Sequence, residues 1–481
     1  MTIDHWIVEA STNTPEKPAI IGDNYSLNYE DFLKAITKVA NGLSSRGIRH
    51  GDRVAWYGLN QPDVFILLFA CARLGAILVP LNWRLAEAEI HEIIADCTPK
   101  AIVHDHHFSA KANLLSSSFI MTLEALKSDE KHNLQQVSTK DSLLLVYTSG
   151  STGRPKGVVL AQDALIANAE MSIDAHKMKS SDRVLNVLPL FHVGGLNILP
   201  TPAFSTGATV ILHEGFEPER AIKALADANL MIVVPTVLQV MISHDAWASA
   251  DLTNLRAFSI GSTDVPVSLI EDIHAKGIPV IQIYGATETS PLAVYQSIDE
   301  AFSSIGSIGR AGCSCEISLQ DNDGNILGDH QIGEICVRGR NTLSQYWKDS
   351  ELTENSIQDG WFHTGDMAQR DEEGLYWFAD RIKHIIISGG ENIYPAEVER
   401  VLRTCPGIVE VAVVGKPDKR WGEVPVAIVK SDGKLTEDEI INFMQNKVAR
   451  YKQPRSVVFM DELPKNAMNK IVVDEIKKKL T

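Results

Sequence analysis

The chain has 481 residues, and its 45 basic and 61 acidic side chains give a formal net charge of −16. This length allows two to four domains, and a hydrophobic content of 44% is typical of a soluble globular protein. The acidic balance argues against sequence-independent binding to nucleic acid or to an anionic membrane, because both need a basic face.

The end of the chain is an exception to this acidic balance. Residues 447–481 contain nine Lys or Arg against four Asp or Glu, a net charge of +5, so the rest of the chain carries −21. This basic end is either a solvated helix surface or a contact zone for a phosphorylated ligand.

The cysteines and the N-terminus indicate a cytoplasmic protein. The six cysteines lack the spacing of a zinc site or a disulfide framework, and the first residues lack the basic and apolar regions of a signal peptide. The longest unbroken apolar run, residues 64–72, is too short to span a bilayer, so no integral membrane segment is expected.

Helical patterns alternate with short β-branched runs through most of the chain. Helices are predicted over residues 29–43, 62–74, 85–96, 218–228 and 265–275. Strands are predicted over residues 53–57, 76–80, 101–103, 209–212, 231–234 and 280–283. This alternation is typical of βαβ units and mainly parallel sheets.

The pattern changes after about residue 333. Residues 333–338 and 375–378 are predicted to be antiparallel strands joined by turns rich in Gly and Asp. The following segment predicts a compact α+β domain, with helices over 395–402 and 436–448 and strands over 409–414 and 424–429. The charged stretch 380–384 is the expected junction.

Two clusters of metal-type residues carry no metal prediction. Residues 104–107 (His-Asp-His-His) have no partner motif and are expected to form a solvated loop. Residues 321–324 (Asp-Asn-Asp-Gly) could begin a calcium loop, but the Gly at its sixth position and the terminal Glu are missing, so they predict a turn between strands.

The most informative segment is Tyr-Thr-Ser-Gly-Ser-Thr-Gly-Arg-Pro-Lys-Gly at residues 147–157, which follows an apolar strand. Open α/β sheets bind ligands at the carboxyl ends of their strands. Small residues let backbone N–H groups approach an anion, and Lys156 adds positive charge. The segment is not a Walker A loop, since GxxxxGK[ST] is absent and Pro155 opposes immediate entry into a helix. It predicts an anion-binding loop.

This segment resembles the phosphate-binding signature of AMP-forming acyl-CoA synthetases and other adenylate-forming enzymes. Four further matches follow in the order of that family, and together they cover nearly the whole chain. They are Tyr284-Gly285-Ala286-Thr287-Glu288, Thr364-Gly365-Asp366, the stretch from Asp380-Arg381 to Pro395, and Pro464-Lys465-Asn466-Ala467-Met468-Asn469-Lys470. The pattern is most similar to bacterial feruloyl/aryl-CoA and fatty-acyl-CoA ligases.

The resemblance implies an α/β fold with a large N-terminal domain and a small lid. Residues 1–382 would form the adenylation domain, with mainly parallel sheets, helices and a β-barrel-like subdomain. Residues 383–481 would form a small mobile α+β domain that rotates about Lys383 between the two half-reactions. A homodimer is common among relatives.

The implied reaction is the attack of a carboxylate on the α-phosphorus of ATP, with pyrophosphate leaving, followed by thioester formation with CoA. Two anions must meet, so the site needs positive charge and fixed donors more than a general base. Lys470 would bridge the carboxylate and the α-phosphate, Thr287 would contact the α-phosphate, and Glu288 would hold Mg²⁺. The implied catalytic residues are Lys156, His192, Thr287, Glu288 and Lys470.

The resemblance also implies positions that bind ATP and CoA. The ATP-binding positions are Thr148, Ser149, Gly150, Ser151, Thr152, Gly153, Lys156, Gly261, Ser262, Thr263, Tyr284, Gly285, Ala286, Thr287, Asp366, Phe378 and Arg381. Asp366 and Arg381 would fix the ribose hydroxyls. Ser388, Gly389 and Gly390 would line the pantetheine tunnel, where a missing Cβ lets the thiol arm pass. Trp421, with Tyr451 and Arg84, resembles positions near the CoA nucleotide. Most relatives have Gly immediately before Lys470, whereas this chain has Asn469. The version with Asn resembles that of the halobenzoate-CoA ligases.

The identity of the acid stays open at this stage. Residues 188–195 match the segment that walls the acyl pocket, and Phe191-His192 stand where amino-acid-activating relatives commonly place an Asp, so an amino acid is disfavoured. The wall segments 191–200, 258–263 and 284–293 are largely apolar, which favours a hydrophobic acid. An aromatic acid (feruloyl, coumaroyl or benzoate-like) and a medium- or long-chain fatty acid are both consistent.

Two other functions are considered beside the CoA ligase. An adenylating enzyme that loads an acyl-carrier protein would use the same first half-reaction. A non-catalytic binding protein on this fold is the third alternative, and the retention of Lys156, Glu288, Asp366 and Lys470 counts against it.

Overall fold

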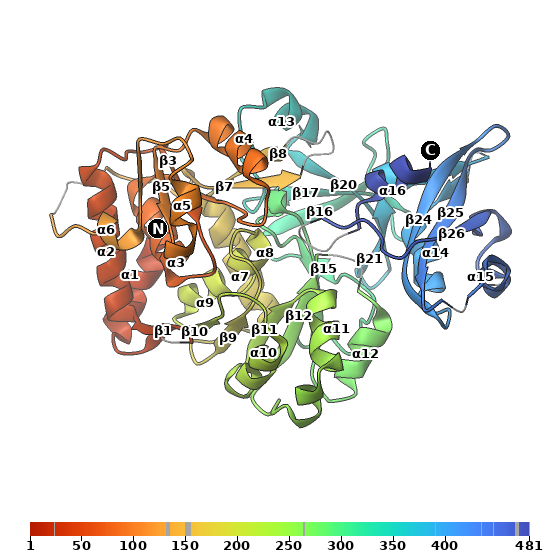
Figure 1. The fold of residues 1–481 in the computed structure, drawn as a ribbon, viewed down its shortest axis with the longest axis horizontal. Helices are drawn as coiled ribbons and strands as arrows, with labels where there is room; N and C mark the ends of the chain where they lie inside the picture. The colour runs from red at the N-terminus through yellow and green to blue at the C-terminus, as the bar shows by residue number, and fades with distance from the viewer. Residues whose placement is uncertain are drawn as a thin grey trace. The chain divides into compact units, whose positions relative to one another are not determined.

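The computed structural model describes residues 1–23, 25–130, 135–149, 155–262, 265–389, 391–433, 435–445, 447–466 and 471–480 (Figure 1). The chain forms two compact units. Unit 1 comprises Met1–Ile317 and Val337–Phe362, and unit 2 comprises Ser318–Cys336 and His363–Thr481. The predicted boundary at 382/383 falls within unit 2 and stays a prediction.

A nine-stranded sheet in unit 1 has the order β15-β14-β13-β12-β11-β9-β10-β1-β2. The pairs from β1 through β10, β9, β11 and β12 to β13 are parallel, and the strands at both edges pair antiparallel. The strands are β1 (Pro18–Ile21), β2 (Ser26–Asn28), β9 (Arg183–Asn186), β10 (Thr209–Leu212), β11 (Leu230–Val233), β12 (Ala257–Gly261), β13 (Val280–Tyr284), β14 (Val294–Tyr295) and β15 (Arg310–Ala311).

A seven-stranded sheet in the same unit has the order β18-β8-β7-β4-β3-β5-β6. Its pairs from β7 to β6 are parallel, whereas β7, β8 and β18 pair antiparallel. The strands are β3 (Arg53–Tyr57), β4 (Ile77–Pro80), β5 (Ala101–His104), β6 (Phe119–Met121), β7 (Ser142–Ser149), β8 (Pro155–Ala161) and β18 (Gln345–Tyr346).

Helices of unit 1 connect these strands and cover the sheets. They are α1 (Asp4–Asn13), α2 (Tyr29–Ser45), α3 (Pro62–Leu74), α4 (Glu87–Cys97), α5 (Ser109–Ala112), α6 (Leu123–Leu126), α7 (Gln162–His176), α8 (Val193–Asn197), α9 (Pro200–Thr206), α10 (Pro218–Ala224), α11 (Pro235–Ser243), α12 (Val267–His274) and α13 (Ser350–Ser356). The Asn28 side chain caps α2 by accepting from the backbone N–H of Asp31 at 2.8 Å. Helix α3 begins with Pro62 and ends at Gly75, whose φ is 68°. No described helix is both long and apolar enough to cross a membrane.

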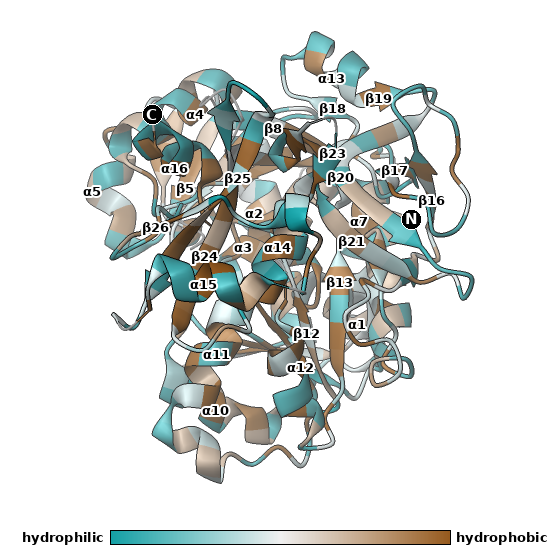
Figure 2. Cartoon of the chain, turned by 90° about the vertical axis from the view of Figure 1, so that its right-hand side faces the viewer, coloured by the Kyte–Doolittle hydropathy of each residue, from teal (hydrophilic) through white to brown (hydrophobic). Residues whose placement is uncertain are grey.

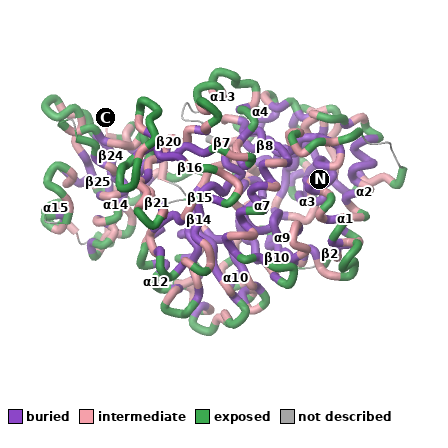
Figure 3. The backbone as a smooth tube through the Cα atoms, turned by 180° about the vertical axis from the view of Figure 1, so that it is seen from behind, coloured by how far each residue is buried: buried purple, intermediate pink, exposed green. Residues whose placement is uncertain are grey.

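Aromatic packing joins helices α2, α3 and α9 of unit 1. The ring centroid of Phe204 on α9 lies 5.1 Å from Phe65 on α3 and 5.3 Å from Phe32 on α2. All three side chains are fully buried. Edge contacts of this kind add to the free energy gained from burying large apolar surfaces. Figure 3 shows the buried strands and helices in purple, with α13 and α15 largely exposed.

A five-stranded sheet joins β16 (Cys315–Gln320), β17 (Gly333–Gly339), β20 (Trp361–Arg370) and β19 (Ile357–Gln358) in this order, with β21 (Tyr376–Arg381) beside β20. Strands β19 and β21 pair antiparallel with β20. Strands form close to both predicted ranges, 333–338 as β17 and 375–378 as β21, and each is a neighbour of β20 in the sheet. Residues 321–324 form the expected turn, in which Asp321 Oδ1 accepts from the backbone N–H of Asp323 at 2.9 Å.

A second five-stranded sheet lies within unit 2. It contains β23 (Glu391–Ile393), β22 (Ile386–Ser388), β25 (Gly422–Ser431) and β24 (Ile408–Asp418) in this order, and β26 (Ser456–Phe459) pairs with β25. Its helices are α14 (Pro395–Leu402), α15 (Glu437–Met444) and α16 (Val473–Leu480). Brown segments in β24 and β25 mark the apolar residues of this sheet (Figure 2), and the α+β prediction is confirmed. Three lysines, Lys477–Lys479, lie in the last turn of α16.

The solvated loop predicted at residues 104–107 is only half right. His104 ends β5 and is 5% exposed, and Asp105 is 9% exposed. The Asp105 carboxylate accepts from the backbone N–H groups of Leu59 and His107 at 2.7 and 2.8 Å. These hydrogen bonds satisfy the Asp105 carboxylate and so lower the cost of burying it.

His176 at the end of α7 makes the stability of the fold depend on pH. It is fully buried, its Nδ1 donates to the Ser172 carbonyl at 2.6 Å, and its Nε2 meets the Ser259 hydroxyl. Burial lowers the pKa of His176 to about 4, whereas an unfolded histidine titrates near 6.5. Stability from neutral His176 is therefore present above pH 6.5 and is lost as the pH falls toward 4.

We expect His176→Gln to flatten this dependence, since Gln can hydrogen-bond but does not titrate. The wild type should lose about 2 kcal/mol of unfolding free energy from this group between pH 7 and pH 5. Urea unfolding at both pH values measures the loss, with His91→Gln, at an exposed position of α4, as control. Equal losses in the wild type and His176→Gln would contradict the assignment.

Candidate active site

Three predicted segments of unit 1 follow the carboxyl ends of parallel strands in the nine-stranded sheet. Strand β9 ends at Asn186, β12 at Gly261 and β13 at Tyr284, and β9, β11, β12 and β13 are successive neighbours. Gly261 pairs with Ile283 in the β12–β13 register. Because these strands are parallel, the segments after them emerge at one edge of the sheet, where α/β folds bind ligands.

The turn after β13 is held tightly by its own backbone. A Cβ at Gly285 would lie 1.6 Å from the Pro291 carbonyl oxygen, so only glycine fits there. The Thr289 hydroxyl accepts from the backbone N–H of Ala286 at 2.9 Å and donates to the Pro291 carbonyl at 2.8 Å. Thr287 and Glu288 lie at the start of the 3₁₀ turn Thr287–Thr289 and are half-buried.

Glu288 is further fixed by a segment that begins 53 residues later, at Asn341. The Tyr346 hydroxyl donates to Glu288 Oε1 at 2.9 Å, and the backbone N–H of Leu343 donates to the Glu288 carbonyl at 2.7 Å. The Asn341 amide donates to the Leu292 carbonyl at 2.8 Å. Burial and then the charge of Glu288 raise the pKa of Tyr346, so its hydroxyl stays a donor. The carboxylate is thus presented in one orientation.

The predicted anion-binding loop connects two antiparallel strands. In the β7–β8 register Thr148 is opposite Lys156 and Ser149 is opposite Pro155. The chain continues from Pro155 into β8, in agreement with the expectation that no helix follows directly. Gly150, Ser151, Thr152 and Gly153 lie outside the described residues.

The segment after β9 forms an aromatic cluster in unit 1. The Phe191 ring is nearly buried, and its centroid lies 4.5 Å from His192 and 6.3 Å from Trp83, the latter at an edge-to-face angle of 89°. The Arg84 guanidinium stacks 5.0 Å above Trp83 and 5.8 Å from the Phe191 ring. An apolar surface of aromatic rings with one cation beside it is therefore built around this segment.

Ser262, after β12, has a φ of 76°. This left-handed conformation favours glycine, so a serine here holds a strained backbone. Its neighbour Thr263 lies outside the described residues.

The predicted ribose-binding pair is formed in unit 2. Asp366 on β20 is opposite Arg381 on β21, and Arg381 Nε lies 2.9 Å from Asp366 Oδ1. The Asp366 side chain is 5% exposed, whereas that of Arg381 is 50% exposed. Phe378 lies on the same strand as Arg381 and is half-buried. A carboxylate held by a guanidinium has further lone pairs that can accept from neighbouring hydroxyls.

The part of β20 that carries Asp366 is fixed by β17. The Glu334 carboxylate accepts from the backbone N–H of Gly365 at 2.8 Å, and the Thr364 hydroxyl donates to the Ile335 carbonyl at 2.8 Å. Three of these residues, Glu334, Asn341 and Tyr346, were not predicted from the sequence. None of them belongs to a recognisable motif, because each contacts the site through a strand or segment far along the chain.

The expected junction contains a buried carboxylate. Asp380 accepts from the backbone N–H of Arg381 at 2.7 Å and, across the predicted boundary, from that of Ala396 at 2.6 Å. Lys383 is exposed in the 3₁₀ turn Ile382–His384. Burial, followed by the charges of Lys383 and Arg381, lowers the pKa of His384 to about 4, so this histidine is neutral at pH 7.

The predicted CoA-tunnel residues lie together in unit 2. The backbone N–H of Gly389 donates to the Trp421 carbonyl at 2.8 Å, and a Cβ at Gly389 would lie 2.7 Å from the Trp421 ring. Gly389 also has a φ of 62°, so both its backbone and its contact require glycine. Ser388 pairs with Gly422. Gly390 lies outside the described residues.

The predicted residues thus form two described groups. The unit 1 group follows β7, β9, β12 and β13, and the unit 2 group comprises the Asp366–Arg381 pair and the Gly389–Trp421 contact. Lys470 lies outside the described residues. A surface hollow of unit 2, lined by residues such as Lys430, Phe459 and Lys479, contains none of the predicted positions.

Comparison with known families identifies the class of protein. Residues 7–347 match the AMP-binding enzyme family, and residues 397–470 match the AMP-binding enzyme C-terminal domain. The chain belongs to the AMP-binding enzyme family and is an AMP-forming acid–thiol ligase. The predicted resemblance, the predicted enzyme class and the predicted use of ATP and CoA are confirmed.

Individual relatives cover almost the whole chain. An indoleacetate–CoA ligase from Aromatoleum aromaticum is 42% identical over 99% of this chain and 98% of its own length. A feruloyl-CoA synthase from Amycolatopsis sp. is 36% identical, with 98% of each chain covered.

Solved structures confirm the predicted fold class. The o-succinylbenzoate CoA synthetase of Bacillus subtilis, in complex with its acyl-adenylate intermediate, has a TM-score of 0.90 and is 31% identical, with 98% of this chain and 97% of its own covered. ATP-bound MatB from Rhodopseudomonas palustris has a TM-score of 0.92 and is 27% identical, with 100% of this chain and 99% of its own covered.

Proposed function

We propose that this AMP-forming acid–CoA ligase activates an aromatic carboxylic acid. The observation that carries the proposal is similarity along nearly the full chain to ligases named for indoleacetate, ferulate and 2-succinylbenzoate, at 42%, 36% and 34% identity. All three acids bear an aromatic ring. The cluster of Trp83, Phe191 and His192 supports it, because aromatic rings favour edge and offset contacts with another ring.

In the proposed first half-reaction, a carboxylate oxygen forms a bond to the α-phosphorus while the bond to pyrophosphate breaks. Thr148, Ser149, Thr152 and Lys156 would hold the β- and γ-phosphates, and Thr287 would donate to the α-phosphate. Lys470 would lie between the two reacting anions. Asp366 and Arg381 would hold the ribose, and His192 would stand beside the acid. The lysines and the hydroxyl groups among these residues supply positive charge or a donor where negative charge builds up.

Glu288 fits the role of a magnesium ligand. Mg²⁺ prefers carboxylate oxygens and is commonly held by one or two of them together with substrate phosphates. The bond from Tyr346 occupies one lone pair of Oε1, and a carboxylate has others to offer. When bound, Mg²⁺ would offset the charge that develops on the departing pyrophosphate.

For the second half-reaction we propose a lid over residues 383–481 that turns about Lys383. The boundary falls between the two family matches, which end at residue 347 and begin at residue 397. Ser388, Gly389, Gly390 and Trp421 would then line the path of the CoA thiol to the acyl adenylate. The thiol sulfur forms a bond to the acyl carbon as AMP leaves. We further propose that the enzyme acts in the cytoplasm as a homodimer.

A panel of carboxylic acids tests the proposal. Indoleacetate, ferulate, benzoate and 2-succinylbenzoate should support pyrophosphate exchange and form CoA esters, and medium- and long-chain fatty acids should do so much more weakly. Exchange assays with and without CoA, followed by detection of the ester, measure both steps. Preference for fatty acids would overturn the aromatic proposal. Exchange without any CoA ester would point to an acyl-carrier protein as acceptor.

We expect Lys470→Ala to slow adenylation by on the order of 10²–10³, about 3–4 kcal/mol, because a transition-state donor is lost. Pyrophosphate exchange measures this step directly. Lys465→Ala, in the same motif, removes a lysine that lies 2.7 Å from Glu410 and should change the rate little. Near-wild-type exchange by Lys470→Ala would refute the role of Lys470.

Tyr346→Phe tests the orientation of Glu288. The variant removes one hydrogen bond to a charged group. We therefore expect the rate of adenylation to fall about tenfold and the Mg²⁺ concentration for half-maximal rate to rise. Binding of Mn²⁺ with ATP, followed by electron paramagnetic resonance, should weaken in parallel. Tyr295→Phe removes a similar 2.9 Å bond, to Asp174, and serves as control. An unchanged Mg²⁺ dependence in Tyr346→Phe would show that Tyr346 does not position Glu288.

A further inference from the structure

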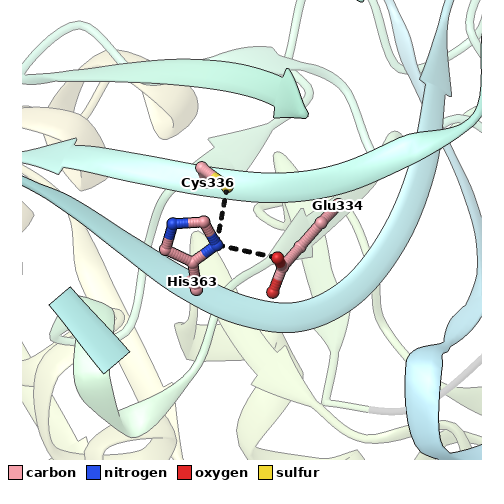
Figure 4. A group of neighbouring side chains, drawn as sticks. All are labelled: Glu334, Cys336 and His363. Carbon is pink, nitrogen blue, oxygen red and sulfur yellow. Dashed lines mark hydrogen bonds and ion pairs between the residues drawn. The ribbon is translucent and has the colours of Figure 1, made fainter. Parts of the chain in front are cut away.

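Three metal-ligating side chains of unit 2 meet between neighbouring strands (Figure 4). Glu334 and Cys336 are two residues apart on β17 and so face the same side of the sheet. His363 lies on β20, the next strand. One ligand atom from each, His363 Nδ1 among them, lies within 4.8 Å of the other two, with 2.8 Å from Nδ1 to Glu334 Oε2 and 3.4 Å from Nδ1 to Cys336 Sγ.

The arrangement is not that of a nucleophile with its base. In such a triad the thiol and the carboxylate bond different nitrogens of the imidazole ring. Here both Cys336 and Glu334 approach Nδ1, and the other ring nitrogen points away from both (Figure 4). The three ligand atoms lie within 4.8 Å of one another, as the ligand atoms around a single ion do.

We propose that Glu334, Cys336 and His363 bind a thiophilic divalent cation of the Zn²⁺ class. Zn²⁺ takes thiolate, imidazole and carboxylate ligands at about 2.0–2.3 Å, which places ligand atoms roughly 3–4 Å apart around a tetrahedral ion. The separations from Nδ1 to the other two ligand atoms are close to this range, so small side-chain shifts suffice. Water would supply the fourth ligand.

Ion binding displaces protons from the cluster. The Cys336 thiol proton leaves to solvent so that the sulfur binds as thiolate. The proton on His363 Nδ1 moves to the other ring nitrogen or to solvent, so that the Nδ1 lone pair faces the ion. Glu334 binds as carboxylate, and no oxidant or reductant is needed.

Two further features favour a site at this place. The second carboxylate oxygen of Glu334 accepts from the backbone N–H of Gly365 at 2.8 Å, a contact of the kind that orients metal ligands. Cys336 is fully buried, whereas the side chains of Glu334 and His363 are 17% and 20% exposed. An ion can therefore approach from the side of Glu334 and His363 while the sulfur is shielded.

The site would also be coupled to the turn that carries Asp366. Glu334 would bind the ion through one oxygen and Gly365 through the other, and Gly365 directly precedes Asp366. The ion should then change the KM for ATP more than kcat. This consequence, unlike the binding itself, rests on the proposed role of Asp366.

Binding is tested on the full chain after removal of metals with a chelator. Co²⁺ should bind with one ion per chain and give a thiolate-to-cobalt charge-transfer band, and Zn²⁺ should displace it. Cys336→Ser should abolish the band, and His363→Gln should weaken binding at least about tenfold. Cys405→Ser, which changes another buried cysteine of unit 2, and His330→Gln, which changes an exposed histidine, should bind as the wild type does.

The outcomes separate the site from the rest of the enzyme. Circular dichroism shows whether Cys336→Ser folds. If Cys336→Ser does not fold, the Co²⁺ binding of His363→Gln tests the site instead. No stoichiometric binding by the folded wild type, or binding unchanged in both variants, would overturn the proposal. Pyrophosphate exchange by the chelated wild type with Mg²⁺ restored tests the proposed function independently, since failure there leaves the Co²⁺ result intact.

Discussion

The backbone register between β12 and β13 sets the geometry on which the unit 1 part of the site depends. A Cβ at Gly261 would lie 2.5 Å from the Ile283 carbonyl oxygen, so the two strands reach their ends in close contact. Parallel pairing carries the chain out of β9, β12 and β13 at one edge. Residues from segments that are far apart in the sequence are therefore brought together at this edge of the sheet.

In unit 2, antiparallel strands bring the predicted site residues together. The pairing of β20 with β21 places Asp366 opposite Arg381, and β17 supplies Glu334 to hold the turn before Asp366. The buried Asp366 carboxylate is thus paired with Arg381, and the backbone before it is held by Glu334. The cost of burying Asp366 is offset by the Arg381 guanidinium, which keeps half of its surface in water.

Much of this was predictable from periodicity and motif. The Pro at the start and Gly after the end bounded α3 at residues 62–74, and the predicted strands at 53–57 and 209–212 agree with the structure. Family motifs identified Glu288 as a candidate Mg²⁺ ligand and Asp366 as a candidate ribose-binding residue. The partners of these carboxylates could not be found in this way. Tyr346 follows Glu288 by 58 residues, and only the folded chain brings them together.

Burial of polar residues was also beyond the sequence. His104 and Asp105 read as solvated because both are polar, yet backbone N–H groups of Leu59 and His107 satisfy the Asp105 carboxylate. The same limit applies to Glu334, Cys336 and His363, whose contact depends on strand order and not on spacing along the chain. The role of Lys470 stays a prediction, since it lies outside the described residues.

The hairpin of β7 and β8 has an electrostatic consequence. Where a phosphate-binding loop leads directly into a helix, the helix dipole contributes about half a positive charge. Here the loop leads into β8, and α7 begins only at Gln162. In the proposed role, phosphate oxygens at this hairpin would meet the charge of Lys156, in a chain whose net charge is −16. Nucleotide capture would then depend on short-range donors, which ionic strength screens less than a long-range field.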